Sequence, residues 1–479
     1  MVAFPEIAID QSSDAPVYRQ IADAVALAIG NGKLHRGQRL PATRELAGHL
    51  GMNRATISAA YALLEESGLI QGHVGRGSFV SEALESSRAS RSQTGEPPAI
   101  NFASSRPAGE AFPLASFRRL SRAVIESDEA SEILQLGSPY GYTPLRRYLL
   151  EKSRADGIAT AGDDILITNG CQQALDLLAR SFTATNTKVV CEDPVYHGLL
   201  RVFGRSGCQV MPVPVGPHGL DLDLLEPVLL QHRPALIVVT PSYQNPTGAT
   251  MPADVRRRLA ELASASGAVI VESDIYSELR YEGEPVPTVK QSDGAGRTLL
   301  LGSYSKISFP GLRVGWVIGP REMIAQMAEE KQVSDLHSDQ LSQAVLLRFA
   351  QSGELDRHVD RTRDMGRQRL DAALESCQAF LPEGCTWTRP AGGMNLWITL
   401  PAPLGAETLL AAARHQGVDF VPGRQFSLTQ GHARSLRISF GGLSPEKIRQ
   451  GLRIVGEAAK RQVAASLNTW DFEPAMALV

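Results

Sequence analysis

Residues 298–316 read TLLLGSYSKISFPGLRVGW, an apolar run that ends in a loop carrying Lys306 and, seven residues later, Arg313. Similar runs precede this stretch, and helical stretches such as 172–182 and 253–266 separate them. The runs are DILIT at 164–168, KVVCED at 188–193, ALIVVT at 235–240 and AVIVESD at 268–274. Continuous apolar runs are typical of strands buried on both faces. Their alternation with helices predicts an α/β layer fold around a mainly parallel sheet.

Polar residues follow the ends of these runs. In LITNGCQQALDLL a glycine turn directs the amides of Cys171 and Gln172 at whatever lies over the helix N-terminus, where an anion fits. The other candidates are Tyr196 in CEDPVYHGLL, Asn245 in PSYQNPTG, Asp274 and Tyr276 in VIVESDIYSEL, and Ser303, Ser305, Lys306 and Arg313 in the loop. A lysine, an acid, a phenol, a stacking ring and a phosphate cradle are what pyridoxal 5′-phosphate needs. The set therefore predicts a site for that cofactor.

Each of these groups has an expected role. Lys306 is the predicted catalytic residue, which forms the Schiff base, and Asp274 keeps the pyridine nitrogen protonated. Tyr276 and Asn245 lie near the phenolate oxygen, and Tyr196 lies flat on the ring. The alternatives are a helix cap for Asp274, a core position for Tyr276 and an aromatic plug for Tyr196. The strand-end position of Asp274, 32 residues before Lys306, favours the cofactor role.

The remaining candidates bind anions. We expect the cofactor phosphate to contact the amides of Cys171 and Gln172 and the side chains of Ser303, Ser305 and Arg313. Arg437 lies between two apolar residues in SLRISF at 435–440, within an alternating strand. A surface arginine is the alternative, but an arginine in that setting needs a partner. We therefore predict that Arg437 binds the anionic group of a small effector.

Length and composition indicate several domains in an ordinary globular protein. The 479 residues exceed one hydrophobic core, and a formal charge of −3 with 21% charged residues excludes a basic nucleic-acid coat. The segment ALESSRASRSQTGEPP at 83–98 has the composition of a flexible connector. We predict a first domain over 1–80, a linker over 81–100 and a second domain over 101–479. Within the second domain, we expect a smaller α+β lobe to begin at about residue 336.

Other features restrict location and chemistry. The N-terminal residues lack an export pattern, and no segment reaches the roughly 18 apolar residues of a membrane span. The five cysteines form no Cys-x-x-Cys pair. We expect a cytoplasmic protein with reduced thiols, no metal site and no membrane contact.

The first 80 residues predict a winged helix-turn-helix. Apolar residues recur every four positions from Val17 to Ile29, which indicates an amphipathic helix. A second helix is expected around Leu46, then a turn at Gly51, and Asn53 caps a third helix. GLIQGHVGRGSFV at 68–80 follows as two short strands around a tip. Residues 31–80 carry six basic and three acidic side chains, a local net charge of +3.

The pieces LPATRELA, MNRATISAAYALLEESGLI and GRGSFV in this segment closely resemble the GntR family of winged helix-turn-helix regulators. The resemblance implies that Arg44 and Arg54 contact double-stranded DNA at the starts of the second and third helices. It places Thr56 and Ser58 nearby and Gly75, Arg76 and Gly77 on the wing, although some relatives carry arginine where Ser58 stands. The alternative to DNA binding is a three-helix unit that serves only for packing. Three motifs in register make this alternative less favoured.

Residues from about 100 to 460 resemble fold type I aminotransferases, and the whole chain resembles the MocR subfamily of GntR regulators. The resemblance implies a homodimer that responds to pyridoxal phosphate, alone or as an adduct with an amino compound. Leu136 lies just before the stretch SPYGYTPLRRYL. Many relatives have a tyrosine at this position, and that tyrosine reaches the phosphate bound by the partner subunit. That difference disfavours full transaminase turnover.

Two functions follow from these observations. In the first, the protein is a transcription regulator whose aminotransferase-like domain is a sensor rather than an enzyme, with a residual half-reaction left open. In the second, it is a genuine pyridoxal-phosphate-dependent aminotransferase with an N-terminal DNA-binding domain. The complete winged helix-turn-helix and the linker favour the regulator.

Overall fold

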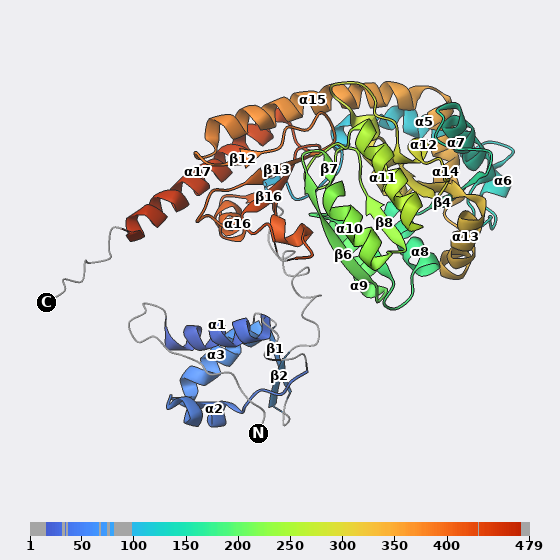
Figure 1. The fold of residues 1–479 in the computed structure, drawn as a ribbon. Coiled ribbons are helices and arrows are strands. Elements are labelled where there is room, and N and C mark those ends of the chain that lie inside the picture. The colour runs from blue at the N-terminus through green and yellow to red at the C-terminus, as the bar shows by residue number, and fades with distance from the viewer. Residues whose placement is uncertain are drawn as a thin grey trace. The chain divides into compact units, whose positions relative to one another are not determined.

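Figure 1 shows the computed structural model, in which the chain divides into two compact units, residues 1–97 and residues 98–479. The structure describes residues 16–30, 34, 37–66, 69–73, 77–80, 98–429 and 431–470. Most of the predicted linker therefore lies outside the described residues.

The first unit contains three helices and a hairpin, as predicted. They are α1 (Val17–Gly30), α2 (Thr43–Leu50), α3 (Arg54–Glu66), and the antiparallel strands β1 (Ile70–His73) and β2 (Gly77–Val80). Gly51 ends α2 at φ 64°, and the side chain of Asn53 caps α3 by accepting the amide of Ala55 at 2.9 Å. Ile21, Ile57 and other apolar residues of the three helices form a shared core. The winged helix-turn-helix is thereby confirmed.

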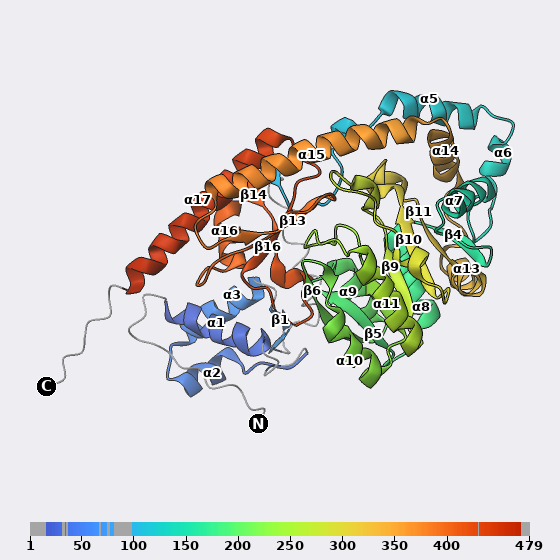
Figure 2. The ribbon, with the colours of Figure 1, turned by 45° about the horizontal axis from the view of Figure 1, so that its top comes forward.

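An eight-stranded sheet forms the centre of the second unit. Its order is β4 (Asp163–Thr168), β11 (Gly315–Pro320), β10 (Thr298–Ser303), β9 (Val269–Ser273), β8 (Leu236–Val239), β5 (Lys188–Asp193), β6 (Gln209–Gly216) and β7 (Gly219–Leu220). Figure 2 shows β9, β10, β11 and β4 side by side. The strands from β10 to β6 are parallel, while β11 and β7 are antiparallel to their neighbours. This confirms the predicted mainly parallel sheet.

Helices cover both faces of the sheet. They are α5 (Leu114–Ile125), α6 (Ala130–Ile133), α7 (Thr143–Ala155), α8 (Cys171–Phe182), α9 (His197–Arg205), α10 (Leu222–His232), α11 (Ala253–Ser266), α12 (Val289–Ser292), α13 (Arg321–Asp335) and α14 (Gln340–Gln351). In β9, Val269 and Val271 pack in one core with residues of α8, α9 and α13, whereas Ile270 packs in another with residues of α10 and α11. Successive side chains of a strand point to opposite faces, so this alternation assigns a face to every residue of β9.

A smaller lobe follows. Its elements are β12 (Thr386–Trp387), β13 (Asn395–Thr399), β16 (Ser435–Ser439) and β15 (Val421–Pro422) in one sheet, β14 (Val418–Asp419) paired with β3 (Ile100–Asn101), and the helices α15 (Glu354–Phe380), α16 (Ala406–Arg414) and α17 (Pro445–Trp470). The core of this lobe begins further along the chain than the boundary expected near residue 336. Residues of α14 and the first turns of α15 pack in the core of the large domain, and Leu370 is the first α15 residue in the core of the lobe.

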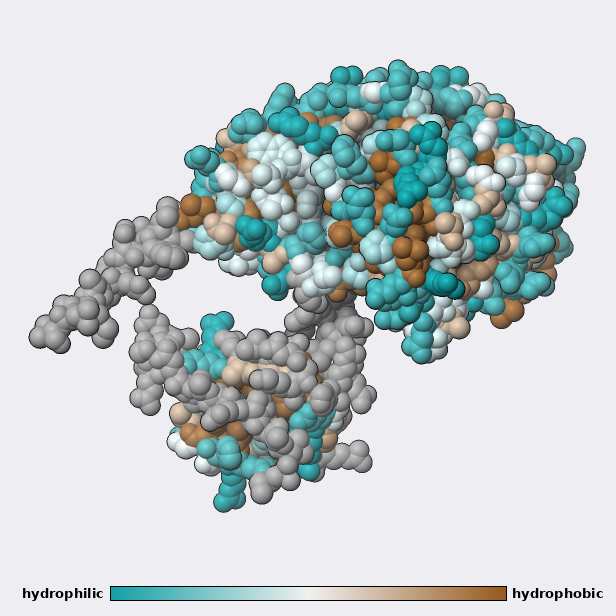
Figure 3. Space-filling view, viewed as in Figure 1, coloured by the Kyte–Doolittle hydropathy of each residue, from teal (hydrophilic) through white to brown (hydrophobic). Residues whose placement is uncertain are grey.

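Hydrophilic side chains cover most of the face of the second unit that Figure 3 shows. Among the described residues, no helix combines the length and the apolar character that a membrane crossing requires.

Candidate functional site

A cavity of about 320 Å³ lies where the ends of β9 and β10 meet the starts of α8 and α9. Of the residues predicted to hold the cofactor or effector, the cavity brings together Cys171, Tyr196, Asn245, Tyr276, Ser303, Ser305, Lys306, Arg313 and Arg437. Gln172 follows Cys171 in the first turn of α8, and its side chain donates to the Gly198 carbonyl at 3.4 Å. Side chains separated by up to 266 positions thus share one site.

Lys306 ends a short 3₁₀ turn, Tyr304–Lys306, directly after β10. Its Nζ donates to the carbonyl oxygen of Ser105 at 2.5 Å and lies 5.5 Å from the ring centre of Tyr276. Tyr276 is buried. Burial alone would raise the pKa of this phenol, but the positive charge of Lys306 contributes to a net pKa below the ordinary value.

The turn between β4 and α8 forms a cradle for an anion. Gly170 precedes α8 with φ 82° and ψ 171°, and the first amides of α8 have no partners within the helix. A Cβ on Gly170 would lie 2.4 Å from Nη2 of Arg313. Ser303 Oγ donates to Ser305 Oγ at 2.9 Å beside this turn. Backbone amides, serine hydroxyls and a guanidinium therefore lie together around Gly170, where a larger residue would not fit. This combination of donors suits a phosphate group.

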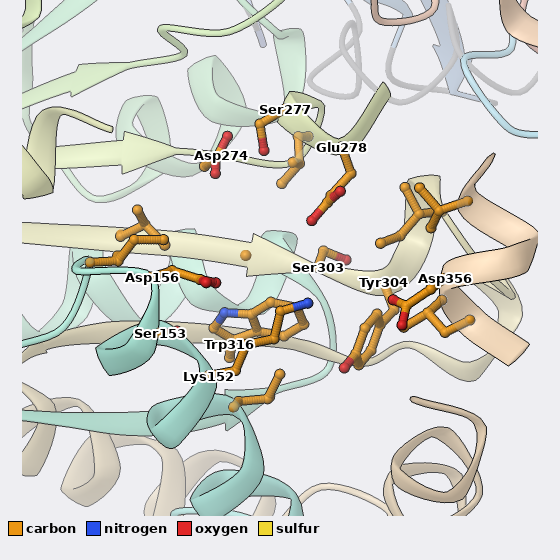
Figure 4. Close-up of a pocket in the computed structure, with 18 of the residues that line it drawn as sticks. Lys152, Ser153, Asp156, Asp274, Ser277, Glu278, Ser303, Tyr304, Trp316 and Asp356 are labelled. Carbon is orange, nitrogen blue, oxygen red and sulfur yellow. The ribbon is translucent and has the colours of Figure 1, made fainter. Parts of the chain in front are cut away.

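Asp274 does not line this cavity. It lies in a neighbouring cavity of about 220 Å³, where Figure 4 shows it with Ser277, Glu278 and Trp316. The two cavities share Ile275 and Ser303 in their lining, and Asp274 directly precedes Ile275, so Asp274 lies at the boundary between them. The role of Asp274 at the pyridine nitrogen stays a prediction.

Arg437 reaches the cavity from β16 in the smaller lobe, with only 2% of its surface exposed. Its Nη1 donates to Asn245 Oδ1 at 3.1 Å, Nη2 donates to the carbonyl oxygen of Ala103, and the guanidinium lies 5.0 Å from the ring centre of Phe426. Burial lowers the pKa of Arg437 to about 10, so it stays charged at neutral pH. Its buried Nε has no partner among the described residues, which leaves one donor for an anionic ligand.

Two aromatic rings at the start of α9 complete the wall. Tyr196 is 37% exposed, and its ring lies 4.9 Å from that of His197. Burial, with the charges of Arg437 and Arg201, lowers the pKa of His197 to about 4, so this imidazole is neutral at physiological pH. Sequence analysis did not select His197, although it directly follows Tyr196.

Cys171 lies in the cavity, but its thiol is not set up to react. Burial raises its pKa to about 11, and Sγ donates to the Gly302 carbonyl at 3.6 Å. At pH 8, on the order of one thiol in a thousand is then ionised. We expect iodoacetamide to leave Cys171 unmodified in the folded protein, as measured by peptide mass spectrometry, and to label it after unfolding. Rapid labelling of the native protein would contradict this description of the thiol.

The first unit exposes the predicted DNA contacts that the structure describes. Arg44 and Arg54 are exposed in the first turns of α2 and α3, Ser58 is exposed and Thr56 is half-buried. Gly77 has φ 100°, and a Cβ there would lie 3.3 Å from Nε of Arg39. Gly75 and Arg76 lie outside the described residues. The exposed Arg39, which sequence analysis did not select, therefore extends the basic surface to the base of the wing.

Comparisons with known proteins match both units. The family described as "Aminotransferase class I and II" matches residues 97–455, and "Bacterial regulatory proteins, gntR family" matches residues 17–80. The chain is 36% identical to an aromatic-amino-acid aminotransferase of Thermococcus litoralis over 76% of its length and 88% of that protein. It is 29% identical to the probable rhizopine catabolism regulatory protein MocR of Rhizobium meliloti, over 94% and 95% of the two chains.

Among solved structures, the kynurenine aminotransferase of Pyrococcus horikoshii, in complex with PMP, superimposes with a TM-score of 0.76 and 34% identity. The match covers 80% of this chain and 97% of that one. Similarity to these two enzymes thus covers 76–80% of the chain, whereas similarity to the regulator covers 94% of it.

Proposed function

Because the chain belongs to the aminotransferase class I and II family and joins that domain to a GntR-type DNA-binding domain, we propose that its second unit senses a small molecule and controls DNA binding by the first. The observation that carries this proposal is the presence, on one chain, of exposed Arg44 and Arg54 and of the cavity around Lys306. The similarity to three proteins named as regulators extends over 94–95% of this chain and 95–98% of theirs, and so includes both units of this chain.

The cofactor of the second unit is pyridoxal phosphate. Bound pyridoxal phosphate supplies an aldehyde that primary amines attack. Lys306 presents the amine that anchors it, the first turn of α8 with Ser303, Ser305 and Arg313 binds its phosphate, and Tyr276 donates to its phenolate. Asp274, which directly precedes the lining residue Ile275, is the residue that we propose for the pyridine nitrogen.

We assign the effector site to Arg437. Its unpaired Nε and its contact with Asn245 suit a carboxylate held beside the cofactor. The proposed effector is therefore pyridoxal phosphate, alone or joined to an amino compound that carries an acidic group.

A homodimer is part of the proposal. Leu134, Leu136, Val333 and Leu336 are 59–90% exposed on the second unit. Gln340 links two of the segments that carry them, because its Nε2 donates to the carbonyl oxygens of Ile133 and Gln135. Exposed apolar residues that gather in this way mark an interface, for which we propose a second copy of the chain. DNA binding supports location in the cytoplasm.

A genuine aminotransferase is the second candidate, favoured by the 36% identity with an enzyme of that class. The two candidates differ in turnover. An enzyme converts excess amino acid repeatedly when a keto acid is supplied, whereas a sensor stops after at most one conversion per site.

The DNA contacts give a direct test of the proposal. We expect Arg54→Ala to weaken binding to a duplex selected by the parent protein by roughly 1–3 kcal/mol, the value of one base contact. Fluorescence anisotropy measures the loss. Arg19→Ala removes the same charge from the exposed side of α1 and serves as the matched control, with little expected change. If both variants lost affinity equally, α3 would not be the element that reads DNA.

A further inference from the structure

A further cavity, of about 630 Å³, lies between the large domain and the smaller lobe. We propose that this inter-lobe cavity binds a planar aromatic carboxylate, as a ligand separate from whatever occupies the cavity around Lys306, here called the cofactor cavity. The large domain contributes Pro194 and residues 215–217 and 247–250, and the smaller lobe contributes residues 387–391, Trp397 and His432. The inference does not rest on the proposed function, because it concerns a different set of residues.

The inter-lobe cavity and the cofactor cavity are neighbours. In the loop after β8, Asn245 lines the cofactor cavity and Thr247 lines the inter-lobe cavity. In the smaller lobe, Trp397 of β13 pairs with Arg437 of β16, so their side chains share one face of that sheet. The ring of Phe426 lies 5.9 Å from the ring of Trp397 and 5.0 Å from the guanidinium of Arg437. The same elements therefore form walls of both cavities.

Hydrogen bonds fix both sides of the inter-lobe cavity. On the large domain, the buried Gln244 donates from Nε2 to the carbonyl oxygen of Pro194 at 2.7 Å, and its Oε1 accepts the hydroxyl of Thr247 at 2.7 Å. On the smaller lobe, the amide of Thr388 donates to the carbonyl oxygen of Trp397 at 3.0 Å, and the Thr388 hydroxyl accepts the amide of Trp397 at 3.0 Å. A wall that is already ordered loses little conformational entropy when a ligand binds.

The ring side chains of the lining suit a flat apolar ligand. Three of them are the prolines Pro194, Pro217 and Pro390. The indole of Trp397 meets the imidazole of His432 in a T-shaped arrangement, with ring centres 5.8 Å apart. An aromatic ligand can stack on such rings or meet them edge to face. The volume also lies within the range of about 300–1,000 Å³ that is typical of small-molecule sites, which often form between domains.

The charge of the inter-lobe cavity favours an anion. Arg389 is exposed where it lines the cavity, and it forms no hydrogen bond or ion pair within the described residues. The described lining contains no aspartate or glutamate that could neutralise this guanidinium. Arginine binds a carboxylate through paired, charge-assisted hydrogen bonds. A carboxylate on a flat ring can therefore contact Arg389 while its ring lies against the aromatic and proline walls.

Calorimetric titration of the full-length protein, loaded with pyridoxal phosphate, with 2-naphthoate tests the inference. This probe has a flat ring and a carboxylate but no amine, so it cannot attach to the cofactor aldehyde. We expect one site per chain with a Kd below about 1 mM. The neutral 2-naphthamide should bind the parent roughly ten-fold more weakly, and Arg389→Gln should bind 2-naphthoate roughly ten-fold more weakly. Arg453→Gln removes an exposed charge from α17 of the same lobe and should bind as the parent does.

Three results would overturn the inference. Absence of 2-naphthoate binding at about 1 mM would remove the site, and equal affinity for 2-naphthamide would show that the cavity does not select a carboxylate. Unchanged affinity in Arg389→Gln would place the ligand elsewhere, such as beside Arg437 in the cofactor cavity. Failure of the parent to bind pyridoxal phosphate would instead refute the proposed function, so the two failures are distinguishable.

Discussion

We expect the Lys306→Ala variant to bind its DNA site like the parent and to lose its entire response to pyridoxal phosphate and amino compounds. The substitution removes the amine that anchors the cofactor, while the phosphate cradle at Gly170 and Arg313 remains. Because Arg44 and Arg54 belong to the other compact unit, DNA affinity should stay within about two-fold of the parent value. Anisotropy titrations with and without the cofactor, and the absorbance of cofactor retained after gel filtration, measure both effects.

Lys306→Arg is the matched control for charge. It keeps the positive charge beside Tyr276 but provides no amine that can attach to the aldehyde. We expect it to lose the response as Lys306→Ala does. A normal response in either variant would mean that covalent attachment is not the switch, and the proposed mechanism would have to be abandoned.

Gly170→Ala should cause the second large loss, in cofactor affinity. The combination of φ 82° and ψ 171° is accessible almost only to glycine, and adopting it costs another residue on the order of 1–3 kcal/mol. The new Cβ would also meet Arg313 Nη2 at 2.4 Å, so the guanidinium and the turn must move apart. Losing one or two charge-assisted contacts to the phosphate weakens binding by roughly 3 kcal/mol, which is about a hundred-fold.

A titration of pyridoxal phosphate followed by absorbance measures this loss. Gly204→Ala is the matched control, because Gly204 lies in α9 and a Cβ there meets nothing within 4 Å. Equal affinities for the two variants and the parent would show that the phosphate does not bind at this turn.

Local patterns in the sequence predict the elements of the fold because each depends on neighbouring residues. The apolar runs correspond to β4, β5, β8, β9 and β10, and Asn53 caps α3 because a short polar side chain can reach the amide of Ala55. The motif around Lys306 also needs only local spacing, since Ser303 and Ser305 lie within one turn of it.

Which side chains share the site depends on contacts between residues far apart in the sequence, and no short sequence pattern contains these contacts. Asp274 is selected for its chemistry, whereas its place beside the cavity depends on the path of the chain after β9 ends at Ser273. Arg437 and Asn245 are 192 positions apart, and only the packing of the two lobes brings them into contact. The lobe boundary depends on such relations too, because α14 has the pattern of any amphipathic helix and its packing partners decide to which core it belongs.

Helix α15 has a consequence for how the second unit melts. Its 27 residues form one uninterrupted helix, with Leu355 and Val359 in one core and Leu370 and Cys377 in the other. Figure 2 shows it running from the region of α5 and α14 to that of α17. Neither core can lose its packing without fraying a helix that the other core holds in place. The two lobes therefore share one cooperative transition, and a ligand bound at either end of α15 raises the melting temperature of both.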